Sequence, residues 1–291
     1  VLGGVLGNQI PNFLNHDLTI TASSIAKLQA INDAAQDLGI TAKVHLKIDT
    51  GMERIGVHYY NAESIIKAAA DCKHVFVEGI YTHFANADDA NLDHAKLQLQ
   101  RFNDVLAIYE KHALSRPPMV HAANSGAILQ LPEARFDIIR PGIMLYGIYP
   151  SNDVIRSVDV KPALSWKSRV VYFKVVKPGH PVGYGSQWQA DKNTRVVTIP
   201  VGYGDGYFRS MSHKAHVVIR GKRYPVVGLI SMDQIVVNIS DDSAFNGDEV
   251  ILVGELDGAS ITVEELAEWA GTISYEILTN INTRVPRVYM D

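Results

Sequence analysis

The chain has 291 residues, of which 47% are hydrophobic and 20% are charged, and its formal net charge at pH 7 is −4. These values are ordinary for a globular chain of about two domains, and the lack of any block of lysine and arginine argues against a nucleic-acid-binding surface. No apolar run approaches the roughly 18 residues of a membrane span. The single cysteine, Cys72, excludes an internal disulfide and suits a reducing compartment.

The first half of the chain alternates between extended and helical patterns. Apolar residues at three- and four-residue steps predict helices over 24–38, 62–70, 92–113 and 126–131. Strands are predicted at Val1–Gly4, Val44–Asp49, Phe76–Thr82, Met119–Ala123 and Phe136–Ile139, with 143–147 continuing the last unit. Strands that alternate with helices imply a parallel sheet. Because no Gly-x-Gly-x-x-Gly turn occurs, we expect a TIM-type (β/α)8 barrel and not a dinucleotide-binding fold.

The pattern changes near residue 160. Short β-branched segments separated by turn residues predict strands at 169–176, 194–201, 215–219, 224–229, 234–239 and 249–253. One helix is predicted over Leu266–Ala270, with Thr262 and Glu265 as its capping box and Gly271 as its end. We therefore expect two domains, a barrel over 1–160 and a mainly antiparallel β domain over 161–291, joined by a polar linker at 151–160.

Polar clusters follow four of the predicted strands of the barrel. They contain Arg54, His83, Ser125 and Arg140. Since the chemistry of closed βα barrels gathers at the C-terminal ends of the strands, we expect these side chains to share one site. The residues around Ser125 and Arg140 resemble two pieces of a phosphate cradle, although Asn-Ser-Gly is also an ordinary turn. The alternative for His83 is a packing role.

Three further residues are singled out by their neighbours. Lys47 alternates with Leu46 and Ile48, so it is expected to face the barrel interior, where a lysine needs a partner or a modification. Tyr184 and Tyr203 each stand between glycines, which weaken strands. One interpretation is that the glycines form a turn that exposes the tyrosine phenol for chemistry. The alternative is two glycine-rich hairpin turns with stacked tyrosines. The 11 histidines show no metal-ligand spacing, so no metal site is predicted.

The order of these segments resembles the alanine racemase family, pyridoxal-phosphate enzymes built from a TIM barrel and a C-terminal β domain. The resemblance runs from about Val1 to Asp291. It is carried by KIDTGMERIG at 47–56, YTHFA at 81–85, Asn124-Ser125, RPGIMLYG at 140–147, VGYG at 182–185, PVGYGDGY at 200–207, SMDQ at 231–234, SYEI at 274–277 and RVPR at 284–287.

The resemblance implies an isomerase that interconverts L- and D-alanine through a pyridoxal-phosphate aldimine by a two-base mechanism, supplying D-alanine as a peptidoglycan precursor. It also implies a cytoplasmic homodimer with shared active sites, a small amino-acid substrate, and no nucleic-acid or membrane partner. Two alternatives stay open. One is a related pyridoxal-phosphate decarboxylase, which would be favoured by a catalytic cysteine in the β domain, whereas Cys72 lies in the first half. The other is a non-catalytic chain that dimerises through its β domain. Alanine and serine are not distinguished as substrates.

The resemblance also implies roles for individual residues. Tyr184 would be the catalytic phenol, acting in the partner's site, Arg140 would face the pyridine nitrogen, and His83 would orient both. Arg54 would hold the substrate carboxylate and the phenolic oxygen of the cofactor. The remaining implied roles are substrate contact by Met232 and Asp233 from the partner, cofactor binding by Asn124, Ser125, Gly142, Ile143 and Tyr275, carbamylation of Lys47, and an access passage lined by Tyr203, Arg209 and Asp88.

One part of the family pattern has no counterpart in the sequence. The family's Schiff-base lysine lies on the first barrel strand, in a Val-Lys-Ala-Asn-Ala-Tyr-Gly-like segment, whereas Val1–Gly4 resembles the third strand. We therefore expect two strands and two helices of the barrel to be missing from this chain. We also expect the chain alone to be unable to racemise alanine.

Overall fold

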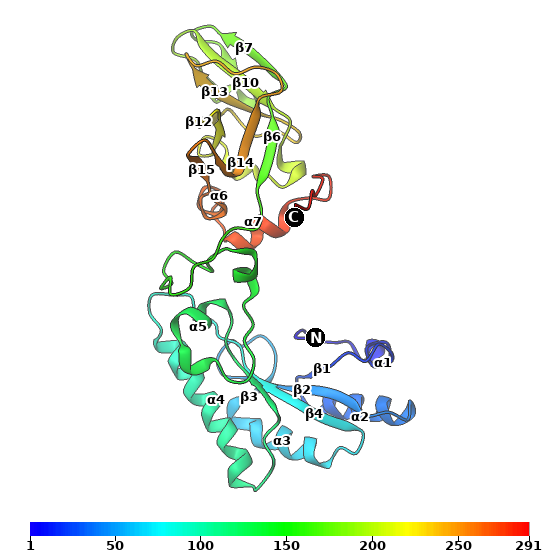
Figure 1. Ribbon diagram of the computed structural model, residues 1–291. Helices are drawn as coiled ribbons and strands as arrows, with labels where there is room; N and C mark the ends of the chain where they lie inside the picture. The colour runs from blue at the N-terminus through cyan, green and yellow to red at the C-terminus, as the bar shows by residue number, and fades with distance from the viewer. Residues whose placement is uncertain (291) are drawn as a thin grey trace. The chain divides into compact units, whose positions relative to one another are not determined.

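The computed structural model in Figure 1 describes residues 1–290, so Asp291, the last residue of the predicted second domain, lies outside the described residues. The chain divides into two compact units. One consists of Val1–Leu145 and Tyr149–Asp159, and the other of Tyr146–Ile148 and Val160–Asp291. Within residues 1–290, no helix has the length and apolar character needed to cross a membrane.

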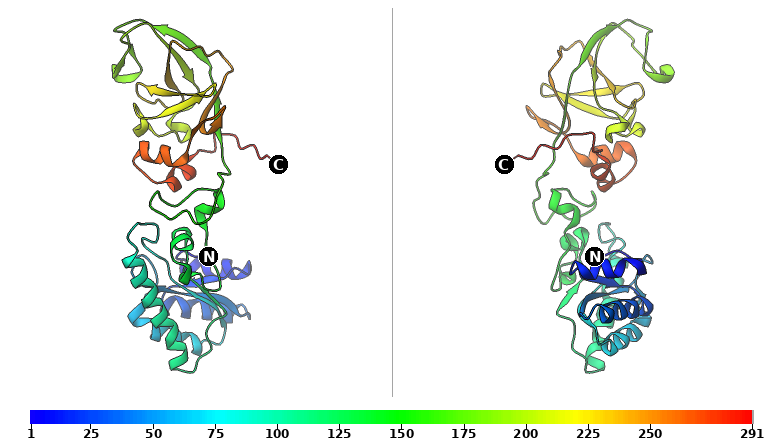
Figure 2. Two further views of the ribbon diagram at one scale, coloured as in Figure 1. Left: turned by 60° about the vertical axis from the view of Figure 1, so that its left-hand side comes forward. Right: turned by 90° about the vertical axis from the view of Figure 1, so that its right-hand side faces the viewer.

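The first unit is built on a parallel sheet in the order β1-β2-β4-β5, with β3 paired to β2. Figures 1 and 2 show α2, α3 and α4 along one side of this sheet, and an apolar cluster that includes Ile31, Ile65 and Phe102 fills the space between. The strands are β1 (Ile20–Ala22), β2 (Ala42–Asp49), β3 (Val57–His58), β4 (Val75–Tyr81) and β5 (Met119–His121). The helices are α1 (Ile10–Asn15), α2 (Ile25–Asp37), α3 (Ala62–Asp71), α4 (Asp93–Lys111) and α5 (Ser125–Gln130).

Three predictions for the first unit are wrong. Val1–Gly4 is not a strand, because the sheet instead takes Ile20–Ala22 as the parallel neighbour of β2. The predicted strand Phe136–Ile139 is reduced to one bridge between Ile138 and His121. The Val120 N–H donates to the Asp137 side chain at 2.8 Å and not to a backbone carbonyl of a neighbouring strand. Residues 143–147 do not extend that strand, since Gly142, at φ +46°, starts the 3-10 helix Gly142–Tyr146.

The second unit is a mainly antiparallel sheet in the order β15-β14-β11-β12-β13-β10-β7, with β6 paired to β14 and β8 paired to β9 in a separate ribbon. Its strands are β6 (Trp166–Arg169), β7 (Tyr172–Val176), β8 (Pro181–Val182), β9 (Trp188–Gln189), β10 (Thr194–Ile199), β11 (His216–Ile219), β12 (Lys222–Val227), β13 (Ile235–Ser240), β14 (Glu249–Leu256) and β15 (Ala259–Ile261). Its helices are α6 (Val263–Ala270) and α7 (Ser274–Asn280). Short 3-10 helices elsewhere in the chain are Gly7–Gln9, Tyr59–Asn61, Pro132–Ala134, Tyr184–Ser186, Tyr203–Asp205 and Arg209–Met211.

The single strand predicted over 169–176 is wrong, because the chain changes partners in its middle. Val170 donates its N–H to the Asp248 carbonyl at 2.9 Å, and Val171 donates to the Thr198 carbonyl at 3.0 Å. The segment before this point therefore pairs with β14 and the segment after it with β10. The capping box before α6 is confirmed, since Thr262 accepts from the Glu265 N–H at 3.2 Å.

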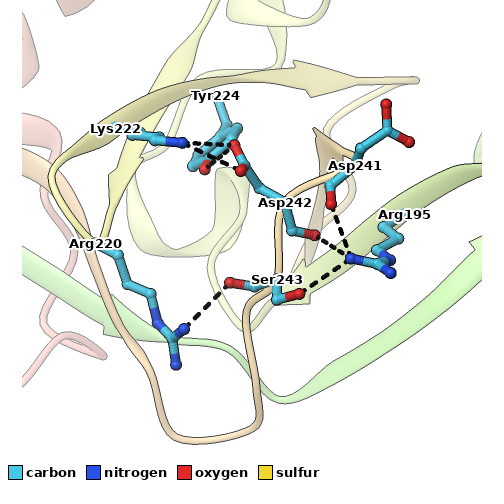
Figure 3. Close-up of polar contacts among 7 residues, drawn as sticks. All are labelled: Arg195, Arg220, Lys222, Tyr224, Asp241, Asp242 and Ser243. Carbon is cyan, nitrogen blue, oxygen red and sulfur yellow. Dashed lines mark hydrogen bonds and ion pairs between the residues drawn. The ribbon is translucent and has the colours of Figure 1, made fainter.

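Basic side chains fix the loop between β13 and β14, as Figure 3 shows. Arg195 from β10 donates to the carbonyl oxygens of Asp241 and Asp242 at 2.8 and 3.2 Å. Lys222 and Tyr224 from β12 donate to the Asp242 carboxylate at 3.1 and 2.8 Å. The loop thereby ties two strands of the sheet together at one end.

Candidate active site

A row of polar side chains crosses the sheet of the first unit. Lys47 on β2 stands opposite Tyr81 on β4, and Tyr81 stands opposite His121 on β5. The Lys47 Nζ lies 4.6 Å from the centroid of the Tyr81 ring, which stacks on the His121 ring at 4.7 Å. Lys47 is 3% exposed, in line with the inward orientation that its alternation predicts. These three strands therefore bring their polar groups together on one face of the sheet.

Arg140 joins this row from the segment that follows Ile138. Its guanidinium lies 2.6 Å from the Nδ1 of His121 and 3.2 Å from the Nδ1 of His83. It also donates to the carbonyl oxygens of Ala122 and Thr82 at 2.8 and 3.0 Å. Arg140 and His83, which were predicted to share a site, are thus held together at the ends of β4 and β5.

The histidines around Arg140 are uncharged at neutral pH. Burial, followed by the positive charge of Arg140, lowers the pKa of His83 to about 4 and that of His121 to about 3. Burial also lowers the pKa of Arg140 to about 10, which leaves the guanidinium charged near pH 7. Because arginine only donates, the Nδ1 atoms of both histidines must accept, and their protons reside on Nε2.

This assignment extends into a hydrogen-bonded chain that ends at a carboxylate. The Nε2–H of His121 donates to the Nδ1 of His45 over 2.8 Å, and the Nε2 of His45 lies 3.3 Å from the Glu78 carboxylate. Burial lowers the pKa of His45 as well, so this ring also acts as a neutral donor. In this series of hydrogen bonds from Arg140 to Glu78, each group therefore donates to the next one in the same direction.

Gly79 makes room for this chain. It stands opposite His45 in the sheet, and a Cβ at Gly79 would lie 2.6 Å from the His45 ring and 2.7 Å from the Met119 carbonyl oxygen. His45, His121 and Glu78 were not among the predicted site residues. The alternation that turns Lys47 inward places His45 on the same face of β2, so one part of this signal was present in the sequence.

The loop after β2 is organised by the buried Asp49. Its carboxylate accepts the backbone N–H groups of Gly51, Met52, Glu53 and Arg54 over 2.9 to 3.2 Å. Burial opposes ionisation, but these four hydrogen bonds outweigh it and lower the pKa of Asp49. The loop ends on the exposed Arg54. Burial, then the charge of Arg140, lowers the pKa of Lys47 to about 7, and Arg54 adds to this effect.

The two pieces of the predicted phosphate cradle meet in the structure. The buried Ser125 hydroxyl donates to the Pro141 carbonyl oxygen. Gly142 has φ +46°, a backbone conformation that favours glycine, and it lies beside the Ser125 hydroxyl, since a Cβ there would be in ordinary contact with the Ser125 Oγ at 3.4 Å. Ile143 is buried beside them, and the Asn124 side chain caps α5 by accepting the Ala127 N–H at 3.0 Å.

The other predicted site residues lie apart from this cluster in sequence. Asp88, in the first unit, is half-buried, and burial raises its pKa. In the second unit, Tyr184 starts an exposed 3-10 turn between two glycines and is itself 72% exposed. Met232, Tyr203, Arg209 and Tyr275 are exposed, and Asp233 pairs with Arg284 at 2.6 Å. Both tyrosines that stand between glycines therefore lie on 3-10 turns, and the turn of Tyr184 is the loop of the hairpin formed by β8 and β9.

Comparison with known proteins decides the family. The family described as "Alanine racemase, N-terminal domain" matches residues 1–150, and "Alanine racemase, C-terminal domain" matches residues 163–289. The chain belongs to the alanine racemase family. The barrel-type domain and the antiparallel β domain expected from the sequence are confirmed by these matches.

Individual alanine racemases are similar over the whole chain. The alanine racemase of Carboxydothermus hydrogenoformans is 45% identical, with 100% of this chain and 79% of that protein covered. Among solved structures, alanine racemase of Clostridium difficile 630 has a TM-score of 0.90 at 36% identity, covering 99% of this chain and 75% of that chain. A histidine racemase from Leuconostoc mesenteroides subsp. sake reaches a TM-score of 0.88 at 29% identity, covering 100% and 78%.

Alanine racemases use pyridoxal 5'-phosphate, and two features of this structure fit that cofactor. Arg140 is a fixed cationic donor of the kind that would face a ring nitrogen. Gly142, which has no side chain and lies beside Ser125, allows the close backbone approach that a phosphate group needs. Among residues 1–290, no three histidine, cysteine, aspartate or glutamate side chains are grouped to hold a metal ion.

Proposed function

We propose that the protein to which this chain belongs interconverts L- and D-alanine with pyridoxal 5'-phosphate. The observation that carries this proposal is the Arg140 guanidinium, which two neutral histidines and two carbonyl oxygens hold at the strand ends. When bound, this cofactor withdraws electrons from the Cα of an attached amino acid and makes its proton acidic. Arg54 and Tyr184 would position the amino acid and move that proton.

Arg140 would donate a hydrogen bond to the ring nitrogen of the cofactor without giving up its proton. Its pKa of about 10 leaves it charged near pH 7. Such a donor limits how much negative charge the ring takes up, which favours rapid return of the proton to Cα. This behaviour suits racemisation better than transamination.

Tyr184 would be the base on one face of Cα, contributed by the partner subunit of a homodimer. A phenol titrates near pH 10 unless its surroundings stabilise the phenolate. The Nδ1 of His83 is occupied by Arg140, so its Nε2–H is free to donate to a phenolate oxygen. In the two-base proposal, the base on the other face of Cα is the family's Schiff-base lysine. We find no counterpart of its segment in residues 1–291.

Arg54 would bind the substrate carboxylate and the phenolic oxygen of the cofactor. Lys47, with a pKa of about 7, is partly neutral near pH 7 and so open to carbamylation, which would place an anion among the arginines. The remaining proposed roles are cofactor binding by Asn124, Ser125, Gly142, Ile143 and Tyr275, substrate contact by Met232 and Asp233 of the partner, and an access passage lined by Tyr203, Arg209 and Asp88. We further propose domains at 1–160 and 161–291 and a cytoplasmic location.

The test is the rate at which the cofactor-loaded protein, with the Schiff-base lysine segment supplied, converts L-alanine to D-alanine and the reverse. Tyr184→Phe removes the proposed base and should lower kcat by about 10²- to 10⁴-fold. Tyr172→Phe, at an exposed tyrosine of the same unit, serves as the matched control and should leave kcat unchanged. An unchanged kcat in Tyr184→Phe would remove Tyr184 from the mechanism. Carbon dioxide release in place of racemisation would favour the decarboxylase.

A further inference from the structure

Helix α4 carries a polar stripe that faces the loops of the candidate site. His94, Gln98 and Arg101 are spaced at i, i+4 and i+7, which places them on one side of the helix. Gln98 is fully buried on a helix whose other buried side chains are mostly apolar. A buried amide is costly unless it is hydrogen-bonded, so the partners of Gln98 indicate what its burial achieves.

The Gln98 amide joins the loop after β4 to the loop after β2. Its Oε1 accepts the Ala85 N–H at 2.9 Å, and its Nε2 donates to the His83 carbonyl oxygen at 3.1 Å. The same Nε2 donates to the Thr50 hydroxyl at 3.4 Å. Both N–H groups and the oxygen of this amide therefore form hydrogen bonds with segments that carry predicted site residues.

The hydrogen bond to Thr50 fixes the direction of the next bond. Because Nε2 only donates, the Thr50 hydroxyl accepts from Gln98 and is free to donate to the Thr82 hydroxyl, 2.7 Å away. Thr50 and Thr82 are fully buried. The Thr82 carbonyl oxygen in turn accepts from Arg140 at 3.0 Å. One side chain of α4 is thus linked to both loops and, through them, to Arg140.

The other two members of the stripe hold the same loop. Arg101 donates to the Thr50 carbonyl oxygen at 2.9 Å, and the His94 ring lies 3.2 Å from the Gly51 carbonyl oxygen. Gly51 has φ +140°, and a Cβ there would lie 3.1 Å from His94 and 3.3 Å from Arg101. The loop that leads to Arg54 therefore passes closely against α4.

We propose that Gln98 is a positioning residue that sets the distance between the Arg54 loop and the His83 loop. This inference rests on the proposed function, in which Arg54 binds the substrate carboxylate and His83 supports the proton-transferring phenol. Gln98 touches neither substrate nor cofactor in this proposal. Its effect on the reaction passes through the Thr50 hydroxyl and the His83 backbone.

The test replaces Gln98 by methionine, which has similar volume but lacks the three polar contacts. We expect KM for alanine to rise about 10- to 100-fold in both directions, since a misplacement of about 1 Å can cost as much as 100-fold. The rate is expressed per cofactor-loaded site, measured from the absorbance of bound cofactor. Gln100→Met, at an exposed glutamine of the same helix, is the matched control.

A second variant covers the case in which Gln98→Met fails to fold. Thr50→Val keeps the shape of Thr50 and removes its hydroxyl, so it should raise KM in the same manner. If Gln98 acts through Thr50, the effects of the two changes should be less than additive in the double variant. Gln98→Asn, whose amide is one methylene shorter, should not restore KM.

The outcomes separate this inference from the proposed function. A wild-type protein that carries the family's Schiff-base lysine segment and still shows no racemase activity would overturn the proposed function and this inference with it. An active wild type whose Gln98→Met and Thr50→Val variants lose only cofactor-loaded sites, with KM unchanged, would show that Gln98 serves stability alone. Raised KM in both variants, with Gln100→Met unaffected, would support the positioning role.

Discussion

At the scale of single residues, the neutral histidines link the site to stability. An ordinary histidine titrates near pH 6.5, whereas His121 does so near pH 3 in the folded protein. As the pH falls below about 6.5, the unfolded chain binds a proton that the folded protein does not, so the free energy of unfolding decreases until the pH nears 3. At pH 5 this loss should amount to about 2 kcal/mol for His121.

Urea unfolding at pH 7.5 and pH 5 measures this effect. We expect His121→Gln to be less stable than wild type at pH 7.5 and to lose about 2 kcal/mol less between the two pH values. His180→Gln, at an exposed histidine, controls for the substitution itself. Equal losses in wild type and His121→Gln would contradict a buried, neutral His121.

Arg54 provides a second prediction at this scale. Arg54→Lys keeps the positive charge but loses the planar fork that binds a carboxylate through two N–H groups. We expect KM for alanine to rise about tenfold, while the melting temperature stays within a degree or two, because Arg54 is exposed. Arg156→Lys, in an exposed segment, is the control. An unchanged KM would separate Arg54 from substrate binding.

The sequence predicted individual polar residues better than their partners. The alternation of Lys47 with Leu46 and Ile48 correctly predicted that Lys47 is buried. The positions of His83 and Arg140 after predicted strands correctly predicted that they lie close together. The contact between His45 and His121 depends on the register of three strands. That register shifts between Val44 and His45, and no local pattern reports such a shift. The three partners of Gln98 are likewise 13, 15 and 48 residues away from it along the chain.

At the scale of elements, helix ends were predictable because their chemistry is local. The α6 capping box was visible in four residues of sequence, and the structure reproduces both of its hydrogen bonds. The strands at 136–139 and 169–176 were mispredicted because their apolar patterns do not say which neighbour they pair with. In each case a contact from a distant segment decides where the strand ends.

The cap of α6 can be tested directly. Thr262→Ala removes the hydroxyl that accepts the Glu265 N–H and should lower the free energy of unfolding by about 1 kcal/mol. Ser260→Ala, at an exposed position on β15, should change it by less than about 0.5 kcal/mol. Urea denaturation followed by circular dichroism measures both. Equal effects of the two substitutions would show that the cap adds no stability.

At the scale of the whole molecule, residues 147–165 contain no helix or strand. Arg156 is exposed within this stretch and lies over the Tyr149 ring at 4.7 Å. Exposed segments without secondary structure are the preferred sites of proteolytic cleavage. We therefore expect limiting trypsin to cut first after Arg156 and to leave two resistant fragments. Arg156→Gln should slow this first cut, and early cleavage within β2 or β14 would contradict the division into units.

Gly79 has a consequence for how this sequence can vary over time. Its missing side chain is the space in which the His45 ring lies, so a methyl group there would collide with both the ring and a neighbouring strand. A lineage that acquires alanine at position 79 would need both a smaller residue at position 45 and a shift of the Met119 backbone. Position 79 should therefore stay glycine in related sequences that keep histidine at position 45, and frequent replacement of this glycine beside a retained histidine would show that the ring has another place to go.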